Sequence, residues 1–490
     1  MIGRDRGVAK RVLTEVDTGS LDLERLVALL DRAQAERVRD AALRARAELA
    51  DRAVINVNST ARGGGVAEML LPLVAYARGT GIDCRWLVIT GTPDFFRVTK
   101  RIHNRLHGAE GDGGPLGPEE REAYESALSD SGEALLERIG PRDVVILHDP
   151  QTAGLVPRVA DAGNPVIWRC HVGIDDPNDL ARSVWKFLAP YIKRADRVVF
   201  SRTRFAWDVV EPSRRAIIAP SIDALAPKNQ NLPDGGAAAI LAAAGLRMDA
   251  GRAAPEYDRL DGTRATVRSR AELDGGAPLR PDDRYVLQVS RWDRLKDPHG
   301  VVDGFVDHVA PWTDAHLLYA GPDVLAVNDD PEGGEVLQAA RERRRTLPEE
   351  IRARVHLAML PMQDIQENAA IVNALQRCAT VVVQKSLAEG FGLTVAEAMW
   401  KSRPVVASRI GGISDQIEHD RSGLLLDDPR DLAAYGASVL ELLRDPDRAA
   451  ALGAAARERV RQNFLGTHSL VDYMALIDPL IGRRADEAAG

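Results

Sequence analysis

The sequence is poor in cysteine, and it contains no long apolar run. Its 490 residues include three cysteines, an odd number at wide spacing, which excludes a disulfide framework and a cysteine-rich zinc site. No stretch of roughly 18 apolar residues is present, so we expect no membrane span. Residues 1–14 are charged and lack the apolar segment of a secretory signal. Together these absences indicate a protein of the reducing cytoplasm.

An excess of positive charge is also lacking. The chain has 64 lysine and arginine residues against 72 aspartate and glutamate residues, which gives a formal net charge of −8. Such a chain has no overall field that attracts nucleic acid or an anionic membrane, so neither is an expected partner. Any anion that it binds must be held by local groups. The hydrophobic fraction of 45% is typical of a globular protein, and the length predicts two or three domains.

Short apolar runs alternate with helical patterns in two blocks of the chain. This alternation is typical of crossover units that build a parallel sheet. In the first block the predicted strands are Ala53–Val57, Cys84–Ile89, Val144–Leu147, Val166–Cys170, Arg197–Phe200 and Ala216–Ile218. In the second block they are Tyr285–Val289, His316–Ala320, Val355–Ala358, Val381–Gln384, Pro404–Ala407 and Gly423–Leu426. Between the blocks, a stretch rich in Gly, Ala, Pro, Asp and Arg shows few strand signals.

We therefore predict an α/β fold with two doubly wound parallel-sheet domains. Residues 1–222 form the first domain, with an amphipathic helical lead-in over residues 21–47, and residues 284–465 form the second. Residues 223–283 are expected to be a connector or surface insertion, and the chain is predicted to be helical from residue 431 to residue 481. In such sheets ligands bind outside the carboxyl ends of the strands, so function must be sought in the residues that follow strands.

The most informative segment, Glu389–Trp400, follows the predicted strand 381–384. Two glycines allow a tight backbone path, and a helix that is predicted to begin near Thr394 offers free N–H groups to a phosphate. Glu389 precedes this helix, and Glu397 lies about one turn inside it. One carboxylate could meet the sugar of a sugar nucleotide and the other its ribose. The alternative is a buried loop and helix in which Glu397 is a capping or solvated residue.

A second charged segment, Ser290–Asp297, directly follows the predicted strand 285–289. Its position places it at the same edge of the sheet as the segment that begins at Glu389. Arg291 and Lys296 could clamp a diphosphate and offset the charge of a leaving group. A solvated charged loop is the alternative interpretation.

Glycines also follow the first predicted strand, in the segment Asn58–Val66. Gly63, Gly64 and Gly65 could let backbone N–H groups approach an anion. Their spacing is not the Gly-x-Gly-x-x-Gly of dinucleotide-binding proteins, and the segment lacks the Lys-Ser/Thr ending of a P-loop. A plain tight turn between strand and helix explains these glycines equally well.

Polar residues end two further strands of the first block. His148, Asp149 and Gln151 follow one strand, and His171 follows the next. Such groups suit the recognition of hydroxyl groups, and Asp149 could assist proton transfer, although a lone histidine at a strand end is more often structural. The sequence contains neither His-Glu-x-x-His nor the Gly-x-Ser-x-Gly nucleophile elbow, so it gives no support to the chemistries that use them.

The segment Glu389–Trp400, together with Pro404–Val406, Gly411–Ile413 and Gly423–Leu425, resembles the donor-binding half of the retaining family-4 glycosyltransferases. The resemblance implies the GT-B fold, in which two Rossmann-like domains face each other across a cleft. It also implies that a final helix, here residues 466–490, crosses back to the first domain. Enzymes of this family need no metal and no other cofactor.

The first half of the chain narrows the resemblance to the glycosyltransferring trehalose synthases. The matching strings are Asn56–Thr60, Gly63–Glu68, His148–Gln151, Trp168–His171, Pro220–Asp223, Asn373–Gln376 and Glu397–Lys401. The related trehalose phosphorylases share many of these strings. The stretch from residue 229 to residue 283 departs from the family in length and composition, which leaves the acceptor open.

By this resemblance a nucleotide sugar is the donor and a small sugar is the acceptor. The implied donor-binding residues are Gly64, Gly65, Arg291, Lys296, Glu389, Gly390, Phe391, Gly392, Leu393, Thr394 and Glu397. The implied catalytic residues are Glu389, Arg291, Lys296 and His171, and the implied acceptor-binding residues are His148, Asp149 and Gln151. Glu389 would hold hydroxyl groups of the donor glucose, and Glu397 would hold the nucleotide ribose.

The implied activity is a retaining transfer of glucose from a nucleoside diphosphate glucose, such as UDP-glucose, to glucose, which gives α,α-trehalose. Uridine and adenosine are both open as the donor base. One alternative is a trehalose phosphorylase that uses inorganic phosphate, and another is a transferase with a non-glucose acceptor. A catalytically silent sugar-nucleotide-binding scaffold is the alternative outside enzymes. The resemblance also suggests a homodimer.

Overall fold

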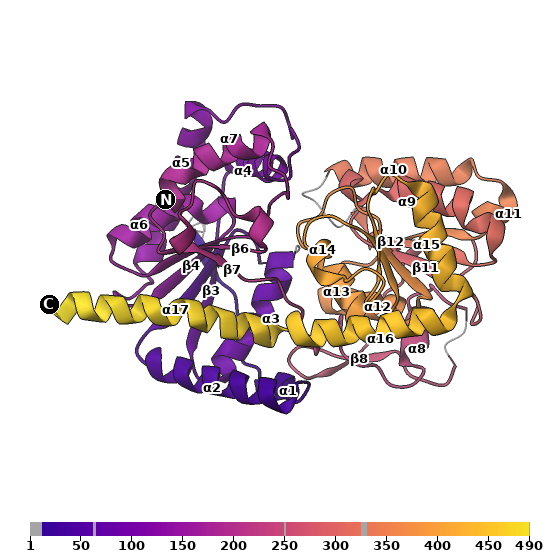
Figure 1. The fold of residues 1–490 in the computed structure, drawn as a ribbon, viewed down its shortest axis with the longest axis horizontal. Coiled ribbons are helices and arrows are strands. Elements are labelled where there is room, and N and C mark those ends of the chain that lie inside the picture. The colour runs from indigo at the N-terminus through magenta and orange to yellow at the C-terminus, as the bar shows by residue number, and fades with distance from the viewer. Residues whose placement is uncertain (1–11, 62–64, 249–250, 325–330, 490) are drawn as a thin grey trace, which may run out of the picture. The chain divides into compact units, whose positions relative to one another are not determined.

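Two units divide the chain in the computed structural model, which describes residues 12–61, 65–248, 251–324 and 331–489 (Figure 1). The first unit consists of Met1–Ala219 and Ser469–Gly490, and the second consists of Pro220–His468. Each unit contains one seven-stranded sheet. Every strand predicted from the sequence is present, and each observed end lies within two residues of its predicted position.

The first sheet is parallel except at one edge. Its strands, in chain order, are β1 (Leu13–Glu15), β2 (Ala53–Asn58), β3 (Asp83–Ile89), β4 (Val144–His148), β5 (Val166–Cys170), β6 (Arg197–Phe200) and β7 (Arg215–Ile217). Their spatial order is β1-β3-β2-β4-β5-β6-β7. The antiparallel edge strand β1 was not predicted, because only Leu13 of its three residues is buried and no alternation can be recognised over so short a run.

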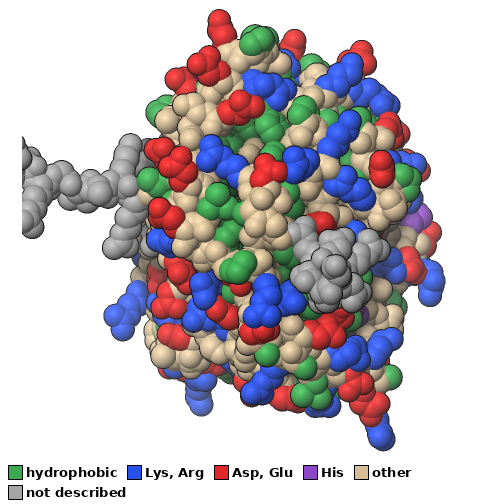
Figure 2. All heavy atoms as spheres, turned by 90° about the vertical axis from the view of Figure 1, so that its left-hand side faces the viewer, with side chains coloured by type: hydrophobic (Ala, Val, Ile, Leu, Met, Phe, Trp, Pro, Cys, Tyr) green, Lys and Arg blue, Asp and Glu red, His purple; other side chains and the backbone are tan. Residues whose placement is uncertain are grey.

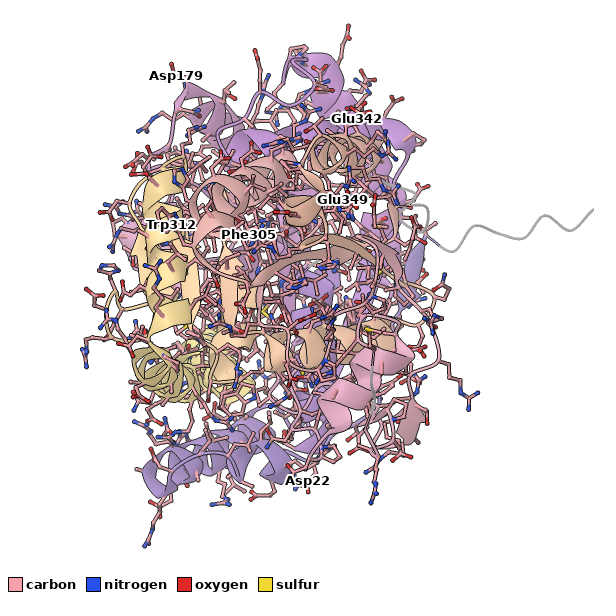
Figure 3. The ribbon with its side chains drawn as sticks, turned by 90° about the vertical axis from the view of Figure 1, so that its right-hand side faces the viewer. Asp22, Asp179, Phe305, Trp312, Glu342 and Glu349 are labelled. Atoms are coloured by element: carbon pink, nitrogen blue, oxygen red, sulfur yellow. The ribbon has the colours of Figure 1, made fainter. Side chains whose placement is uncertain are left out.

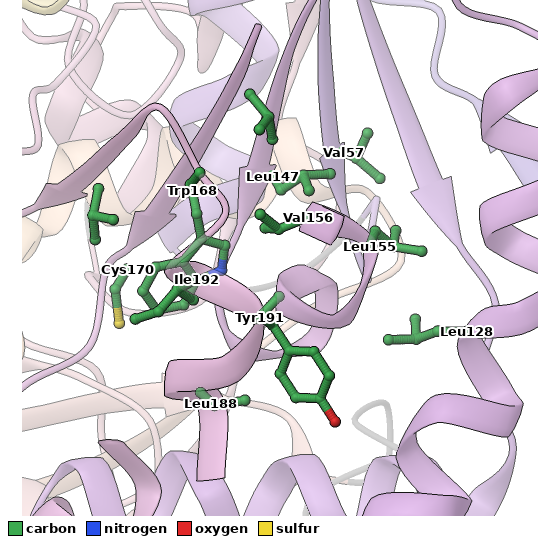
Figure 4. Packing of buried hydrophobic residues seen from close by; sticks show 14 of the residues in the cluster. Val57, Leu128, Leu147, Leu155, Val156, Trp168, Cys170, Leu188, Tyr191 and Ile192 are labelled. Atoms are coloured by element: carbon green, nitrogen blue, oxygen red, sulfur yellow. The ribbon is translucent and has the colours of Figure 1, made fainter. Parts of the chain in front are cut away.

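Helices cover both faces of this sheet, as a doubly wound fold requires. They are α1 (Glu24–Val27), α2 (Arg32–Glu48), α3 (Gly65–Gly79), α4 (Pro93–Leu106), α5 (Pro118–Leu136), α6 (Val156–Asp161), α7 (Asp179–Ile192) and α17 (Gly466–Ala489). Figure 4 shows the core on one face, where Val57, Leu147 and Trp168 of the strands meet Leu188 and Ile192 of α7. On the opposite face, α3 and α17 pack against the same strands.

The second sheet repeats this plan with a different strand order. Its strands are β10 (Glu272–Asp274), β11 (Tyr285–Val289), β12 (His316–Pro322), β13 (Val355–Leu360), β14 (Val381–Gln384), β15 (Val405–Ser408) and β16 (Leu424–Leu426). The spatial order is β10-β13-β12-β11-β14-β15-β16, with β10 antiparallel and the remaining strands parallel. The unpredicted strand is again a three-residue antiparallel edge.

The helices of the second unit also lie on both faces of its sheet (Figure 1). They are α8 (Gly236–Ala243), α9 (Pro298–His308), α10 (Pro331–Arg345), α11 (Glu349–Arg352), α12 (Ile365–Cys378), α13 (Leu393–Trp400), α14 (Ile413–Gln416), α15 (Leu432–Arg444) and α16 (Pro446–Asn463). Helices α9, α10 and α15 share one core with the strands. Figure 3 labels Phe305 of α9, which is fully buried in that core, and Trp312, which is 66% exposed.

Residues 223–283, predicted as a connector, lie within the second unit. They form α8, the hairpin of β8 (Glu256–Asp258) and β9 (Arg264–Thr266), and the edge strand β10. Leu273 of β10 pairs with Ala358 of β13, so the segment extends the second sheet. Strands of three residues leave no recognisable hydrophobic period, which is why the sequence suggested a connector here.

The strand order reverses once within each sheet, and this position determines where a ligand binds in a doubly wound fold. In the first sheet the reversal lies between β2 and β4, and in the second it lies between β11 and β14. In a doubly wound fold the loops that follow the two strands at a reversal run to opposite faces of the sheet and leave a crevice outside the strand ends. The segments singled out in the sequence follow these four strands, except His171, which follows β5.

Within the described ranges, no helix combines the length and the apolar character needed to cross a membrane. On the face drawn in Figure 2, basic and acidic side chains are intermixed rather than gathered into a broad patch of one sign.

Candidate functional site

The carboxyl ends of β11 and β14 lie side by side and carry two loops that are bound to each other. The loop after β11 runs through Ser290–Asp297, and the loop after β14 runs through Lys385–Gly392. Their backbones are joined where the Leu387 N–H donates to the Leu295 carbonyl at 2.7 Å. The two charged segments predicted from the sequence are therefore neighbours at the strand-order reversal of the second sheet.

Lys296 and Glu389 form an ion pair across these two loops. The Lys296 Nζ lies 2.7 Å from the Glu389 Oε2, and the two side chains are only 15% and 12% exposed. The Ser386 hydroxyl donates to the same carboxylate oxygen at 3.4 Å. An ammonium group and a carboxylate are thus held together at the sheet edge, where they can meet a phosphoryl oxygen and a hydroxyl group, respectively.

A second ion pair, which was not predicted from the sequence, joins the same two loops. The fully buried Lys385 forms an ion pair with Asp297. Asp297 has a φ of 51° and caps α9, where its Oδ1 accepts from the Gly300 N–H at 3.1 Å. Lys385 therefore holds the end of one loop on the start of the other. The available signal was a lysine directly after the wholly buried strand 381–384.

Three glycines fix the path of the Glu389 loop. Gly392 has a φ of 81° and leads into α13. Gly411 has a φ of 47°, and a Cβ at this position would lie 2.0 Å from the Glu389 carbonyl oxygen. The Gly412 N–H donates to the Gly390 carbonyl at 2.8 Å. The close backbone approach that these glycines permit holds Glu389 toward Lys296.

Helix α13 begins at Leu393, one residue before the predicted start, so its first amide groups and positive dipole end are at the same sheet edge. The Thr394 hydroxyl is occupied, because it donates to the Gln384 Oε1 at 3.0 Å. Phe391 is 7% exposed, and its ring packs edge-on against Phe464 at 5.8 Å. The Thr394 hydroxyl proton is therefore not available to a ligand, and the backbone amide is the donor that this residue can offer.

Arg291 differs from Lys296 in its surroundings. Its side chain is 56% exposed and pairs with Asp293, where the Nη2 to Oδ2 distance is 3.0 Å. The geometry leaves the guanidinium accessible. The predicted role of Arg291 at a diphosphate stays a prediction.

Glu397 is 3% exposed inside α13. Its Oε1 lies 3.5 Å from the Lys228 Nζ. Its Oε2 is buried and accepts no hydrogen bond from any residue within the described ranges. A buried carboxylate oxygen without a donor is costly, and a ligand hydroxyl would supply one.

In the first unit, His148 and His171 form a pair at the strand-order reversal. His148, at the end of β4, is fully buried, and its Nδ1 lies 3.1 Å from the Nε2 of His171. Its Nε2 lies 3.0 Å from the Asn56 Oδ1. Burial, reinforced by the nearby Arg169, lowers the pKa of His148 to about 3 and lowers the pKa of His171 well below its ordinary value. Both rings are therefore neutral near pH 7.

The hydrogen bonds also fix the tautomers of the two rings. The Asn56 carbonyl oxygen can only accept, so the His148 Nε2 carries the proton and the His148 Nδ1 accepts. The His171 Nε2 must then donate to His148, which leaves the His171 Nδ1 as an acceptor. Both ring nitrogens of His148 are engaged, so a direct contact with an acceptor would have to displace one of these partners.

Asp149 joins this pair through the backbone. It has a φ of 65°, and its Oδ1 accepts from the His171 N–H at 2.8 Å. Burial raises the pKa of Asp149 from 3.8 to about 6, although the His171 N–H and the Arg169 charge act in the opposite direction. Asp149 thus has a carboxyl group that can change protonation near neutral pH.

Two further predicted residues flank the same edge. Gln151 lies in a short 3-10 turn after β4, and its Oε1 is buried without a donor among the described residues. Gly65 is the first residue of α3 and is exposed, whereas Gly64 lies outside the described residues. Within the described ranges, no cluster of three or more His, Cys, Asp or Glu side chains could hold a metal ion.

Comparisons with known proteins match both halves of the chain. Residues 56–207 match the model of the trehalose synthase N-terminal domain, and residues 269–459 match that of the group 1 glycosyl transferases. A trehalose synthase of Rubrobacter xylanophilus is 35% identical over 433 residues, which is 88% of this chain and 91% of that protein. A trehalose phosphorylase of Grifola frondosa is 27% identical over 86% of this chain and 56% of its own length.

Among solved structures, an α,α-trehalose-phosphate synthase (UDP-forming) from Burkholderia vietnamiensis aligns with a TM-score of 0.63 at 15% identity. The alignment covers 87% of this chain and 98% of that one. At this identity the likeness establishes the fold alone, which is GT-B. The fold, the two matched domains and the 35% identity over most of both chains lead to one conclusion: the chain belongs to the trehalose synthase family of group 1 glycosyltransferases.

Proposed function

We propose that this protein transfers glucose from a nucleoside diphosphate glucose to glucose, with retention of the anomeric configuration, and forms α,α-trehalose. The observation that carries the proposal is the Lys296–Glu389 pair at the strand-order reversal of the second sheet. Membership in the trehalose synthase family supports the same product. A phosphate-binding cation beside a hydroxyl-binding carboxylate fits a sugar that is esterified to a diphosphate.

The second unit would hold the donor. Lys296 and the first amides of α13 offset the negative charge that grows on the departing diphosphate, and Arg291 adds to this field from a more exposed position. Glu389 accepts hydrogen bonds from hydroxyl groups of the hexose. Because the ion pair is assembled before the ligand arrives, little reorganisation is needed during the reaction.

The first unit would present neutral hydrogen-bonding groups. The His171 Nδ1 accepts from a sugar hydroxyl, while His148 acts through His171 by fixing its tautomer. Asp149 and Gln151 would contribute to the acceptor side, with the buried Gln151 Oε1 taking a hydroxyl donor. Neutral imidazoles suit this role, since a sugar acceptor carries no charge.

In the proposed reaction the bond between C1 of glucose and the diphosphate oxygen breaks. The bond from C1 to the acceptor oxygen forms on the same face of the ring. The acceptor proton passes to the departing diphosphate oxygen, so no side chain has to act as a nucleophile. The contribution of the protein is stabilisation of the leaving group and orientation of the two sugars.

The test is a product analysis. The protein is incubated with ¹³C-labelled glucose and with UDP-glucose or ADP-glucose, and the products are followed by NMR. The proposal predicts a symmetric disaccharide with two α-anomeric carbons and one nucleoside diphosphate released per disaccharide. If none of the donors yields a glycoside, or if the linkage is not α,α, the proposal is wrong.

Trehalose phosphorylase is the second candidate, favoured by the 27% identity to the Grifola frondosa enzyme. In that reaction inorganic phosphate would occupy the place of the diphosphate near Lys296. Incubation of trehalose with phosphate distinguishes the two, because a phosphorylase releases a glucose phosphate without any nucleotide.

A further inference from the structure

Residues 227–231, at the start of the segment predicted as a connector, are tied to helix α12 on both sides of Lys228. The buried Asn373 amide donates to the Pro227 carbonyl at 3.0 Å and to the Gln230 carbonyl at 2.9 Å. The Arg377 Nη2 donates to the Gln230 carbonyl at 2.8 Å. Since residues before and after Lys228 are fixed, its backbone has a defined position on the second unit.

Lys401 ties the same segment to helix α13. Its buried Nζ donates to the Asn229 Oδ1 at 2.9 Å, to the Gln376 Oε1 at 2.8 Å and to the Glu397 carbonyl at 3.0 Å. Burial, together with the nearby Arg377 and Lys228 charges, lowers the pKa of Lys401, and the Glu397 charge acts in the opposite direction. Three acceptors match the three protons of an ammonium group.

These contacts explain motif residues to which the proposed reaction gives no role. Asn373 and Gln376 belong to one string of the family resemblance, and Lys401 belongs to another. Asn373 and Lys401 bind the segment that carries Lys228 directly. Gln376 binds Lys401 and supports that segment indirectly.

The fixed segment places the Lys228 ammonium against Glu397. The Nζ to Oε1 distance is 3.5 Å, and the side chains are 20% and 4% exposed. The other oxygen, Oε2, is buried and accepts no hydrogen bond within the described part of the chain. One carboxylate oxygen therefore has a cation beside it, and the other lacks a hydrogen-bond donor among the described residues.

We propose that Lys228 is a positioning residue that orients Glu397 so that its second oxygen accepts hydrogen bonds from the vicinal hydroxyls of the nucleotide ribose. The inference rests on the proposed function, since it concerns the same donor. A carboxylate without a fixed neighbour would rotate about its terminal torsion, which is soft. Lys228 removes this freedom, and the buried oxygen then favours a ligand that has a hydroxyl over one that lacks it.

The experiment measures nucleotide binding rather than turnover. Dissociation constants of UDP, ADP and their 2′-deoxy forms are determined by calorimetry for the wild type, Lys228→Met and Lys228→Arg. We expect the wild type to bind the ribonucleotide at least about tenfold more tightly than the 2′-deoxy form. Lys228→Met should reduce this ratio of dissociation constants at least about fivefold, because it weakens binding of the ribonucleotide alone. Lys228→Arg should keep most of the preference for the ribonucleotide.

The matched control is Lys186→Met, which replaces an exposed lysine of α7 in the first unit. It should leave both dissociation constants unchanged. In steady-state assays Lys228→Met should raise KM for the donor while kcat stays within about twofold, as expected for lost ground-state binding. If Lys228→Met fails to fold, Lys228→Gln, which keeps a donor but not the charge, is measured instead.

Four results would overturn the inference. An equal loss of affinity for both nucleotides in Lys228→Met would mean that the lysine supports only the fold or the overall electrostatic field of the site. Tighter ribonucleotide binding would mean that Lys228 competes with the ribose for Glu397. A wild type that binds nucleotides without a preference for ribose would refute this inference alone, whereas one that binds no nucleotide would refute the proposed function as well.

Discussion

The two sheets carry opposite kinds of chemistry at their strand-order reversals. The second sheet presents charged pairs, Lys296 with Glu389 and Lys385 with Asp297. The first sheet presents neutral imidazoles, with a buried histidine whose pKa is lowered to about 3. The same α/β plan thus yields one edge suited to an anionic ligand and one suited to an uncharged, hydroxyl-rich ligand.

The difference follows from what each edge buries. In the second sheet the mostly buried Lys296 and the fully buried Lys385 each lie beside a carboxylate that pairs with them. In the first sheet His148 and His171 are buried beside each other and near Arg169, so protonation is disfavoured at both rings. Removing a charge at the edge of the second sheet should therefore lower activity, whereas adding a charge to the histidines of the first sheet should lower stability.

The largest effect is expected from breaking the charged pair. Lys296→Met or Glu389→Gln should lower kcat by roughly 100- to 1000-fold, because leaving-group stabilisation and sugar positioning are lost. The double variant should be far less impaired than the product of the two single effects, since the residues act together. Steady-state kinetics on all three variants provides the measurement.

The control for this cycle is Lys186→Met, which removes an exposed lysine from the other unit and should retain full activity. A fall of less than tenfold in both single variants would show that the charged edge is not where the donor reacts.

A smaller loss is expected when the loop of Glu389 is displaced without changing any charge. Gly411→Ala would place a Cβ 2.0 Å from the Glu389 carbonyl oxygen at a φ of 47°. The loop must shift, so kcat should fall about tenfold or more and the melting temperature should drop by several degrees. Gly334→Ala, an exposed helical position with nothing within 4 Å, should leave activity intact and tests whether glycine replacement itself is harmful.

Lowering the pH should reduce the folding stability of both units, because each unit buries histidines that are neutral in the folded state. At the amino end of the second sheet, His316 Nδ1 lies 2.9 Å from His356 Nε2, and burial lowers the pKa of His356 to about 4. The unfolded chain binds a proton below a pKa of 6.5, whereas the folded ring does not, so stability is complete above pH 6.5 and falls as pH drops toward 4. Each such histidine costs about 1.4 kcal/mol per pH unit in this window.

Thermal melting between pH 5 and pH 7 checks this expectation. His356→Gln should reduce the pH dependence of the transition of the second unit, and His148→Gln that of the first. Asp149 opposes the trend in the first unit, because its raised pKa of about 6 means that the folded state gains stability as pH falls below 6. A melting temperature that stays constant from pH 7 to pH 5 would contradict the neutral histidine pairs.

The smallest effect is expected at Arg291. Its side chain is 56% exposed, so water and salt screen its charge. Arg291→Ala should lower kcat/KM by about tenfold or less, and the difference from wild type should shrink as salt is added. A loss as large as that of Lys296→Met would mean that Arg291, rather than Lys296, provides the main stabilising charge.

The sequence predicted the two sheets well because most of their strands are buried and largely apolar runs bounded by turns, as at Val144–His148 and Val381–Gln384. The edge strands Leu13–Glu15 and Glu272–Asp274 escaped because they are short and mostly exposed or half-buried, whereas the equally short Leu424–Leu426 is apolar and wholly buried. Edge strands are stabilised by the partner strand rather than by their own pattern.

The candidate site was predictable where one segment contains both the structural signal and the chemical group, as at Glu389 and Lys296. Contacts between distant segments were not. Lys228 and Glu397 lie far apart in the sequence, at opposite ends of much of the second unit. Only the fold brings the Lys228 Nζ to 3.5 Å from the Glu397 Oε1. Likewise, the sequence placed His148 at a strand end but could not show that both of its nitrogens are occupied.

A crystal structure with a bound nucleoside diphosphate glucose tests the central claim most directly, namely that the charged edge of the second sheet holds the donor. We expect phosphoryl oxygens within hydrogen-bond distance of the Lys296 Nζ and hexose hydroxyls on the Glu389 carboxylate. A nucleotide sugar bound elsewhere, with the Lys296–Glu389 pair untouched, would contradict it.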